Sequence, residues 1–81
     1  MRLPTDISGK ELVNLLSKFG YRVVRQTGSH IRLSTSKSGE HHVTVPDHDH
    51  LRIGTLSGIL SDIAEHFNIP RDALIDRLME K

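Results

Sequence analysis

Residues 21–33 read YRVVRQTGSHIRL and predict two strands joined by a tight turn. The first six residues are rich in tyrosine and valine, which favour strands, and the Thr-Gly-Ser triplet at 27–29 has the composition of a hairpin turn. Polar and apolar residues alternate after the turn, as in a strand with one buried face. Ile31 and Leu33 are therefore expected on one side of the sheet, with His30 and Arg32 on the other.

A third strand is predicted downstream. Residues 34–39 are polar and read as a loop, and residues 42–45 then alternate again. Val43 and Val45 are expected to face the core, whereas His42 and Thr44 face away from it. Pro46 has no backbone N–H donor and should end this strand.

Amphipathic patterns predict two helices around the strands and a short third helix near the C-terminus. Ser8 and Glu11 have the spacing of a capping box, and Gly20 suits the left-handed position after a helix, so the first helix covers about residues 9–19. The second helix is expected to begin at residues 54–55 with Thr55 as its N-cap, and Pro70 suits the first turn of the third. The apolar positions of the three helices are Leu12, Leu15, Leu16, Phe19, Leu56, Ile59, Leu60, Ile63, Phe67, Ala73, Leu74, Ile75 and Leu78.

The order α-β-β-β-α, followed by a short C-terminal helix, predicts an α+β fold. Apolar helix stripes and half-buried strands both need a partner, so we expect a three-stranded antiparallel sheet with the helices on one face. Double-stranded-RNA-binding domains have the same order. Residues 1–81 are expected to form one domain, because a chain of this length has no room for a second core.

Composition narrows the functional classes. The chain has no cysteine, which excludes disulfides and thiolate metal sites. Residues 10–37 include six basic residues and one acidic residue, whereas residues 61–81 include five acidic and three basic residues. A basic half favours a polyanion such as nucleic acid, although an ordinary solvated surface has the same composition. With no signal-peptide core and no apolar segment of roughly 20 residues, we expect a cytoplasmic protein without a membrane span.

His30 is the main candidate for catalysis. An imidazole on the outer face, directly after the turn, can take a proton from a ribose 2′-hydroxyl or give one to a leaving oxygen near neutral pH. Arg32 shares that face and can bind a phosphate through two parallel hydrogen bonds, with Arg25 as a second flanking arginine and Ser29 as a further hydroxyl. A solvated strand face would explain the same residues without any function.

His48 follows the end of the third strand and is expected to approach the same edge of the sheet, where it would contact RNA. Residues 41–50 also contain His41, His42 and His50 among aspartates, which raises the alternative of a metal site. The spacing argues against that alternative, because adjacent histidines on a strand point to opposite faces and no H-E-x-x-H helix is present. We therefore expect no metal or other cofactor.

Several short motifs resemble those of the HicA (YcfA-like) toxins, in the same order along the chain. They are the helix that ends in Phe19-Gly20-Tyr21, the run Val24-Arg25-Gln26-Thr27-Gly28-Ser29-His30, the segment Val43-Thr44-Val45-Pro46-x-His48, and Gly54-Thr55-Leu56-x-x-Ile59-Leu60. The resemblance extends from about Ser8 to Leu78.

The resemblance implies a fold like that of double-stranded-RNA-binding domains and a toxin that cleaves mRNA independently of the ribosome. It implies neutralisation by a HicB-type antitoxin, so that the toxin is a monomer when free and part of a hetero-oligomer when bound. The family's catalytic histidine falls on His30, and no catalytic role is carried over to His48. Many members have a second histidine after the first, where this chain has Ile31, a residue expected in the core.

Two alternatives remain open at this stage. The chain could be an RNA-binding module without catalysis, which would use the same face and the basic first half. It could also be an interaction protein that completes a repressor complex with its antitoxin. RNA cleavage by the purified chain separates the nuclease from both alternatives.

Overall fold

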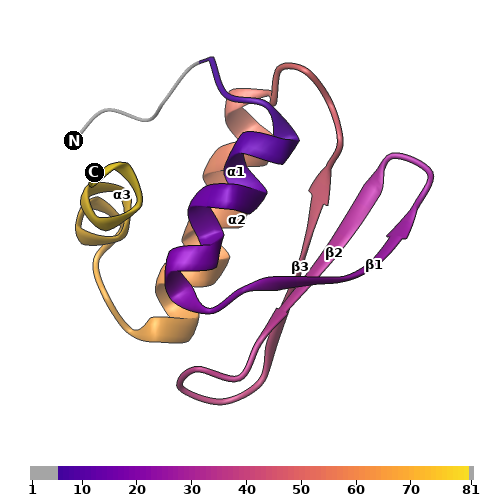
Figure 1. The fold of residues 1–81 in the computed structure, drawn as a ribbon. Coiled ribbons are helices and arrows are strands. Elements are labelled where there is room, and N and C mark those ends of the chain that lie inside the picture. The colour runs from indigo at the N-terminus through magenta and orange to yellow at the C-terminus, as the bar shows by residue number, and fades with distance from the viewer. Residues whose placement is uncertain (1–5, 81) are drawn as a thin grey trace.

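The computed structural model describes residues 6–80 and has the element order expected from the sequence (Figure 1). Three strands lie between a first and a second helix, and a third helix follows. The bounds are α1 Gly9–Leu16, the short 3₁₀ helix η1 Ser17–Phe19, β1 Arg22–Thr27, β2 His30–Thr35, β3 His41–Pro46, α2 Ile53–Phe67 and α3 Arg71–Met79.

The three strands form one antiparallel sheet in the order β1-β2-β3. A two-residue turn, Gly28-Ser29, joins β1 to β2, and Gly28 has a φ of +57°, which glycine adopts without steric cost. At the turn end of the sheet, His30 of β2 pairs with Thr27 on one side and with Pro46 on the other. The α+β fold with a three-stranded antiparallel sheet is as predicted.

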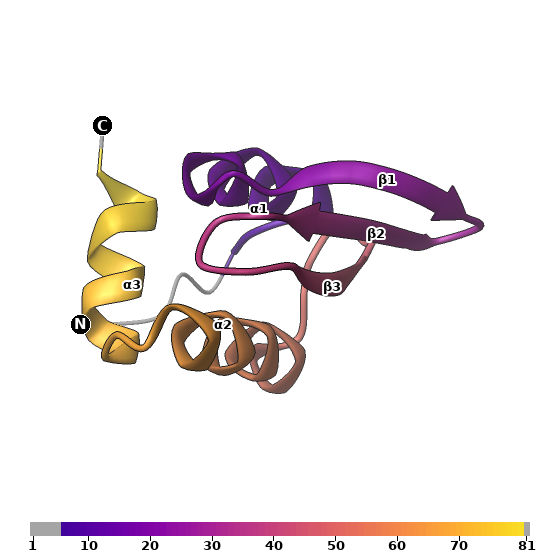
Figure 2. The same ribbon diagram turned by 90° about the horizontal axis from the view of Figure 1, so that it is seen from below.

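The core lies between the sheet and the helices α1 and α2, which pack on the same face (Figure 2). Four strand residues that the alternation assigned to this face, Ile31, Leu33, Val43 and Val45, are all buried. Helix α3 packs against α1 and α2 at the side of the molecule. None of the helices within residues 6–80 is long and apolar enough to cross a membrane.

Helix α1 begins as the sequence predicted and ends earlier. The Ser8 hydroxyl accepts a hydrogen bond from the Glu11 N–H at 3.1 Å, and the Glu11 carboxylate accepts one from the Ser8 N–H at 2.9 Å. The α-helix ends at Leu16, and residues 17–19 continue as η1 up to Gly20, whose φ of +81° reverses the chain. A tighter last turn of this kind commonly closes a helix.

Other boundaries also differ from the sequence predictions, those of β2 and α2 among them. Strand β2 continues through Thr35, which pairs with His41 of β3. Thr35 is buried, and its hydroxyl is satisfied there because it donates to the Phe19 carbonyl at 3.0 Å. Helix α2 begins at Ile53 rather than at Thr55. Arg52 occupies the N-cap, with an extended backbone and a carbonyl that accepts the Leu56 N–H at 2.9 Å, so the expected cap at Thr55 was wrong.

Candidate nucleic-acid interface

His30 lies on the outer face of the sheet, at the first position of β2 directly after the turn. The turn fixes its backbone, and the pairing with Thr27 and Pro46 fixes the direction of its side chain. Its neighbour Ile31 points the opposite way and is buried, as the alternation predicted. The imidazole of His30 is therefore exposed, and its strand is fixed in place because the next residue, Ile31, is buried in the core.

A β-bulge in β1 brings a second arginine onto this face. Val23 pairs with Leu33, but the next pair joins Arg25 to Arg32, so Val24 is an extra residue without a partner. Without the bulge, Arg25 would oppose Ile31 and point toward the core side of the sheet. The extra residue instead places Arg25 directly across from Arg32 on the outer face.

His30 and the two arginines line one shallow cavity of about 300 Å³. Two threonines, Thr27 and Thr44, complete its walls, and no acidic side chain contributes to them. A second hollow of about 410 Å³ lies between β3 and the first half of α2, and it shares Arg32 and Thr44 with the first. The two hollows therefore adjoin at Arg32 and Thr44.

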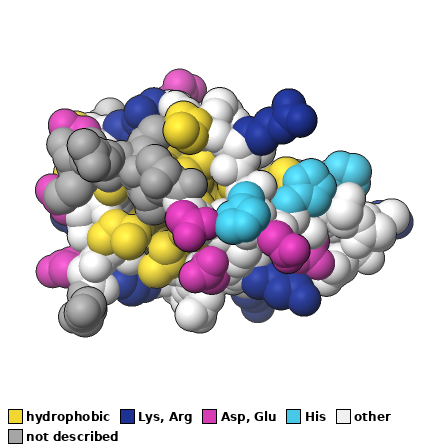
Figure 3. Space-filling model, turned by 90° about the horizontal axis from the view of Figure 1, so that it is seen from above, with side chains coloured by type: hydrophobic (Ala, Val, Ile, Leu, Met, Phe, Trp, Pro, Cys, Tyr) yellow, Lys and Arg dark blue, Asp and Glu magenta, His cyan; other side chains and the backbone are white. Residues whose placement is uncertain are grey.

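Neither Ser29 nor His48 lines this cavity, although Ser29 directly precedes His30 in the turn. The Ser29 carbonyl accepts the Asp47 N–H at 2.6 Å, and the His48 carbonyl accepts the Gly9 N–H at 2.9 Å. These bonds fasten the chain after β3 to both the β1–β2 turn and the start of α1. Figure 3 shows histidine side chains gathered, next to acidic and basic ones, on the end of the molecule where the β3–α2 loop and this turn lie.

The other histidines of the predicted polar cluster point to separate partners. His42 Nε2 lies 3.0 Å from Glu40, and His50 Nδ1 lies 2.8 Å from Asp6. His41 turns to the helix side of the sheet, where its Nε2 lies 3.2 Å from Asp62 of α2. Within residues 6–80, no group of three or more histidine or carboxylate side chains could bind a metal ion.

His41 also lies in the middle of a half-buried series of hydrogen-bonded side chains, Tyr21–His41–Asp62. Because the Asp62 carboxylate can only accept, Nε2 of the neutral His41 ring carries the proton, and Nδ1 accepts from the Tyr21 hydroxyl at 2.6 Å. Burial, and secondarily the negative charge of Asp62, raises the pKa of Tyr21 to about 12. Tyr21 is buried and cannot reach a substrate, so this chain of groups joins β3 to α2 and is not a second reactive site.

The cavity around His30 has the groups needed to act on a phosphodiester. A guanidinium group can donate two parallel hydrogen bonds to phosphate oxygens, and an exposed imidazole can transfer a proton. Two arginines directly opposite each other on a sheet also repel, which is unfavourable until an anion lies between them.

A family model described as the HicA toxin of bacterial toxin–antitoxin systems matches residues 9–64. The chain belongs to the HicA toxin family. The matched residues include α1, the whole sheet and all but the end of α2, and therefore contain the cavity around His30. The family resemblance seen in the sequence motifs is thereby confirmed. Comparisons with curated proteins and with solved structures found no match.

Some features of the His30 cavity were not visible in the sequence pattern. The alternation assigned His30, Arg32 and Thr44 to the outer face, and the structure places all three there. Thr27 was read only as a turn residue, although it lines the cavity. The register of Arg25 depends on the bulge, and the VV pair before it gives no reliable signal for an extra residue.

Proposed function

We propose that this HicA family member is an endoribonuclease that cleaves mRNA without a metal ion, with His30 as its catalytic residue. His30 takes the proton from a ribose 2′-hydroxyl while the 2′ oxygen attacks the adjacent phosphorus atom. The bond from phosphorus to the 5′ oxygen then breaks, and the imidazolium returns its proton to that leaving oxygen. The products are a 2′,3′-cyclic phosphate and a free 5′-hydroxyl.

One observation carries the proposal: the exposed imidazole shares a cavity with two arginines that face each other across two strands. Arg25 and Arg32 would bind the scissile phosphate and stabilise the extra negative charge of the transition state. Ser29, directly before His30, and His48, in the loop after β3, would contact the flanking nucleotides.

The family also suggests the partner. A HicB-type antitoxin would cover the outer face of the sheet and so block access to His30. We expect the toxin to be a monomer when free and part of a hetero-oligomer with its antitoxin. Both would act in the cytoplasm, where mRNA is found.

Cleavage of an mRNA transcript by the purified chain tests the proposal, with His30→Ala compared to wild type in the presence of EDTA. We expect cleavage by the wild type and a loss of about a hundredfold or more in the variant, as is typical when an acid–base group is removed. His42→Ala is the matched control, because His42 lies on the same face at the other end of the sheet, opposite Ser34. Equal cleavage by wild type and His30→Ala would reject the assignment of His30.

A second candidate is an RNA-binding module without catalysis, because the same two arginines and threonines would bind a phosphate whether or not His30 reacts. This candidate predicts salt-sensitive RNA binding and intact RNA after long incubation. A cyclic phosphate at the end of a fragment, absent with His30→Ala, would eliminate it.

A further inference from the structure

A second cavity lies at the other end of the sheet from His30 and has no role in the proposed cleavage. It has a volume of about 660 Å³, in the range that holds small ligands. Its walls come from η1, the β2–β3 loop, the end of α2 and the end of α3. Since β2 runs from His30 to Thr35 at roughly 3.3 Å per residue, the two sites are separated by at least about 16 Å.

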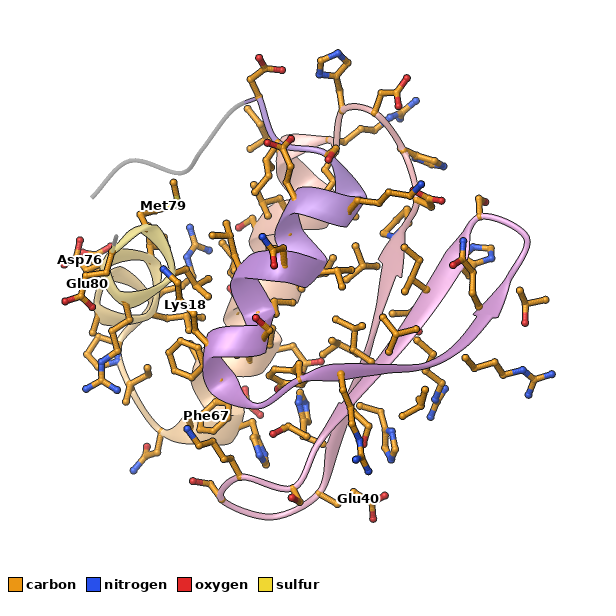
Figure 4. All side chains as sticks on the ribbon, in the orientation of Figure 1. Lys18, Glu40, Phe67, Asp76, Met79 and Glu80 are labelled. Atoms are coloured by element: carbon orange, nitrogen blue, oxygen red, sulfur yellow. The ribbon has the colours of Figure 1, made fainter. Side chains whose placement is uncertain are left out.

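Three cations surround this cavity. Lys18 Nζ donates to the Leu78 carbonyl at 2.8 Å and also to the Glu80 carbonyl, so this lysine neutralises the end of α3 (Figure 4). Lys37 of the β2–β3 loop and Arg77 of α3 form no ion pair with any residue between 6 and 80. Their charges are therefore available to an anion inside the cavity.

The remaining wall is aromatic and apolar. The Phe67 ring lies 5.2 Å from the ring of Phe19, centroid to centroid, and at a tilt of 56°. Phe19 is buried, whereas Phe67 and Ile69 are half-buried and line the cavity. A flat, partly apolar ring of a ligand can pack there while its anionic group reaches the cations.

The loop that contributes Lys37 is held in a conformation that costs energy. Ser38 has a φ of +56°, a region that residues other than glycine seldom adopt, and it lines the cavity. The His66 Nε2 atom lies 2.9 Å from the Lys37 carbonyl and fastens the loop to the end of α2. Backbone strain of this kind is often found where a loop presents groups to a ligand.

We propose that this cavity binds a nucleoside phosphate. The base would pack on Phe67, the phosphate would lie between Lys37 and Arg77, and the Ser38 hydroxyl and Glu80 carboxylate would hydrogen-bond the sugar or the base. The family match ends at residue 64, so Phe67, Ile69, Arg77 and Glu80 lie outside the matched segment. The ligand is either a free nucleotide or one nucleotide of a single-stranded RNA, and both have the same chemistry.

The test is an NMR titration of the isotope-labelled full chain carrying His30→Ala, which keeps the outcome independent of RNA cleavage. We expect adenosine 5′-monophosphate to shift the amide signals of Lys37, Ser38 and Phe67. Adenosine alone and inorganic phosphate alone should each bind at least about tenfold more weakly, because each lacks half of the contacts. A single-stranded RNA that shifts both this set and the signals near residue 30 identifies RNA as the source. Shifts caused by the mononucleotide alone identify a free nucleotide.

Variants locate the binding site. Lys37→Gln and Arg77→Gln should each weaken binding of the mononucleotide about tenfold, as expected for a lost hydrogen bond to a charged group. Lys10→Gln, which removes the same charge from an exposed position outside the cavity, should leave the affinity unchanged. The proposal is overturned if Lys10→Gln weakens binding equally, if the mononucleotide shifts only signals near residue 30, or if it causes no shift. It is also overturned if an acidic peptide saturates the Lys37 and Phe67 signals and the nucleotide does not.

Discussion

Arg25 and Arg32 combine a cost to folding with a benefit to the proposed phosphate binding. They oppose each other across β1 and β2 without an acidic side chain in the cavity that they line. Like charges in this arrangement destabilise a sheet, roughly by 0.2–1 kcal/mol. The proposed phosphate, placed between the two guanidinium groups, would remove this repulsion.

Replacing Arg25 should therefore separate stability from activity. We expect Arg25→Gln to raise the free energy of unfolding by a few tenths of a kcal/mol at low salt, and to lower RNA cleavage by about tenfold or more. Urea denaturation and a cleavage assay measure the two quantities. The gain in stability should disappear at high salt, where the repulsion is screened. A variant that is less stable than wild type at low salt would contradict the argument.

The buried Tyr21 determines whether the free energy of unfolding rises or falls at alkaline pH. Burial raises the pKa of its phenol to about 12, above the value of 10.0 expected for an unfolded chain. Between these two pH values the unfolded chain has lost the proton and the folded chain has kept it, so the free energy of unfolding falls as pH rises. The loss should approach about 2–3 kcal/mol at pH 12 and be absent below pH 10.

Tyr21 is the single tyrosine of the chain, so phenolate absorbance reports on this residue alone. We expect the absorbance midpoint near pH 12 for the folded protein and near pH 10 in concentrated urea. In Tyr21→Phe, the dependence of unfolding free energy on pH in this range should become weaker. The same midpoint in buffer and in urea would show that the Tyr21 hydroxyl is not buried against His41.

At the scale of elements, the backbone at the start of α1 packs closely against the backbone at the end of β3. A β-carbon on Gly9 would lie 2.0 Å from the Pro46 carbonyl oxygen, and the Gly9 N–H donates to the His48 carbonyl at 2.9 Å. Gly9→Ala should therefore lower the free energy of unfolding by about 1–3 kcal/mol, because backbone atoms must move apart. Gly58→Ala in α2 is the matched control, since nothing lies within 4 Å of its added carbon. Alanine should stabilise that helix by roughly 0.5–1 kcal/mol, and urea denaturation of both variants checks the contrast.

The elements of this fold were largely predictable, because each has a local signal. The Ser8–Glu11 capping box located the start of α1, and the alternation around His30 assigned the buried face of β2. Features that depend on distant contacts were missed. Thr35 is a strand residue because it pairs with His41 of β3, and Arg25 reaches the candidate site through a bulge. The cavity at Lys37 and Arg77 joins residues that are far apart in the sequence, so no local pattern indicates it.

For the whole molecule, the structure separates two groups of cations along the sheet. Arg25 and Arg32 lie near the β1–β2 turn, and Lys37 and Arg77 lie at the far end, beside α3. Arg22 lies on β1, opposite Ser34, outside both cavities. An RNA held by a general positive field would depend on all of these residues equally, whereas an RNA bound at the His30 cavity would depend on the first pair.

The salt dependence of RNA binding distinguishes these two cases, because each phosphate contact adds about 0.7 to the slope of log affinity against log salt for a single strand. In a His30→Ala background, which prevents the proposed cleavage, we expect Arg25→Gln and Arg32→Gln each to reduce that slope by about 0.7. Arg22→Gln removes the same charge from the same sheet and should change the slope much less. Fluorescence anisotropy with a labelled single-stranded RNA, measured over a series of salt concentrations, gives all four slopes. Equal reductions for Arg22, Arg25 and Arg32 would mean that the sheet attracts RNA only through its overall charge, and the scissile phosphate would then lack a defined position relative to His30.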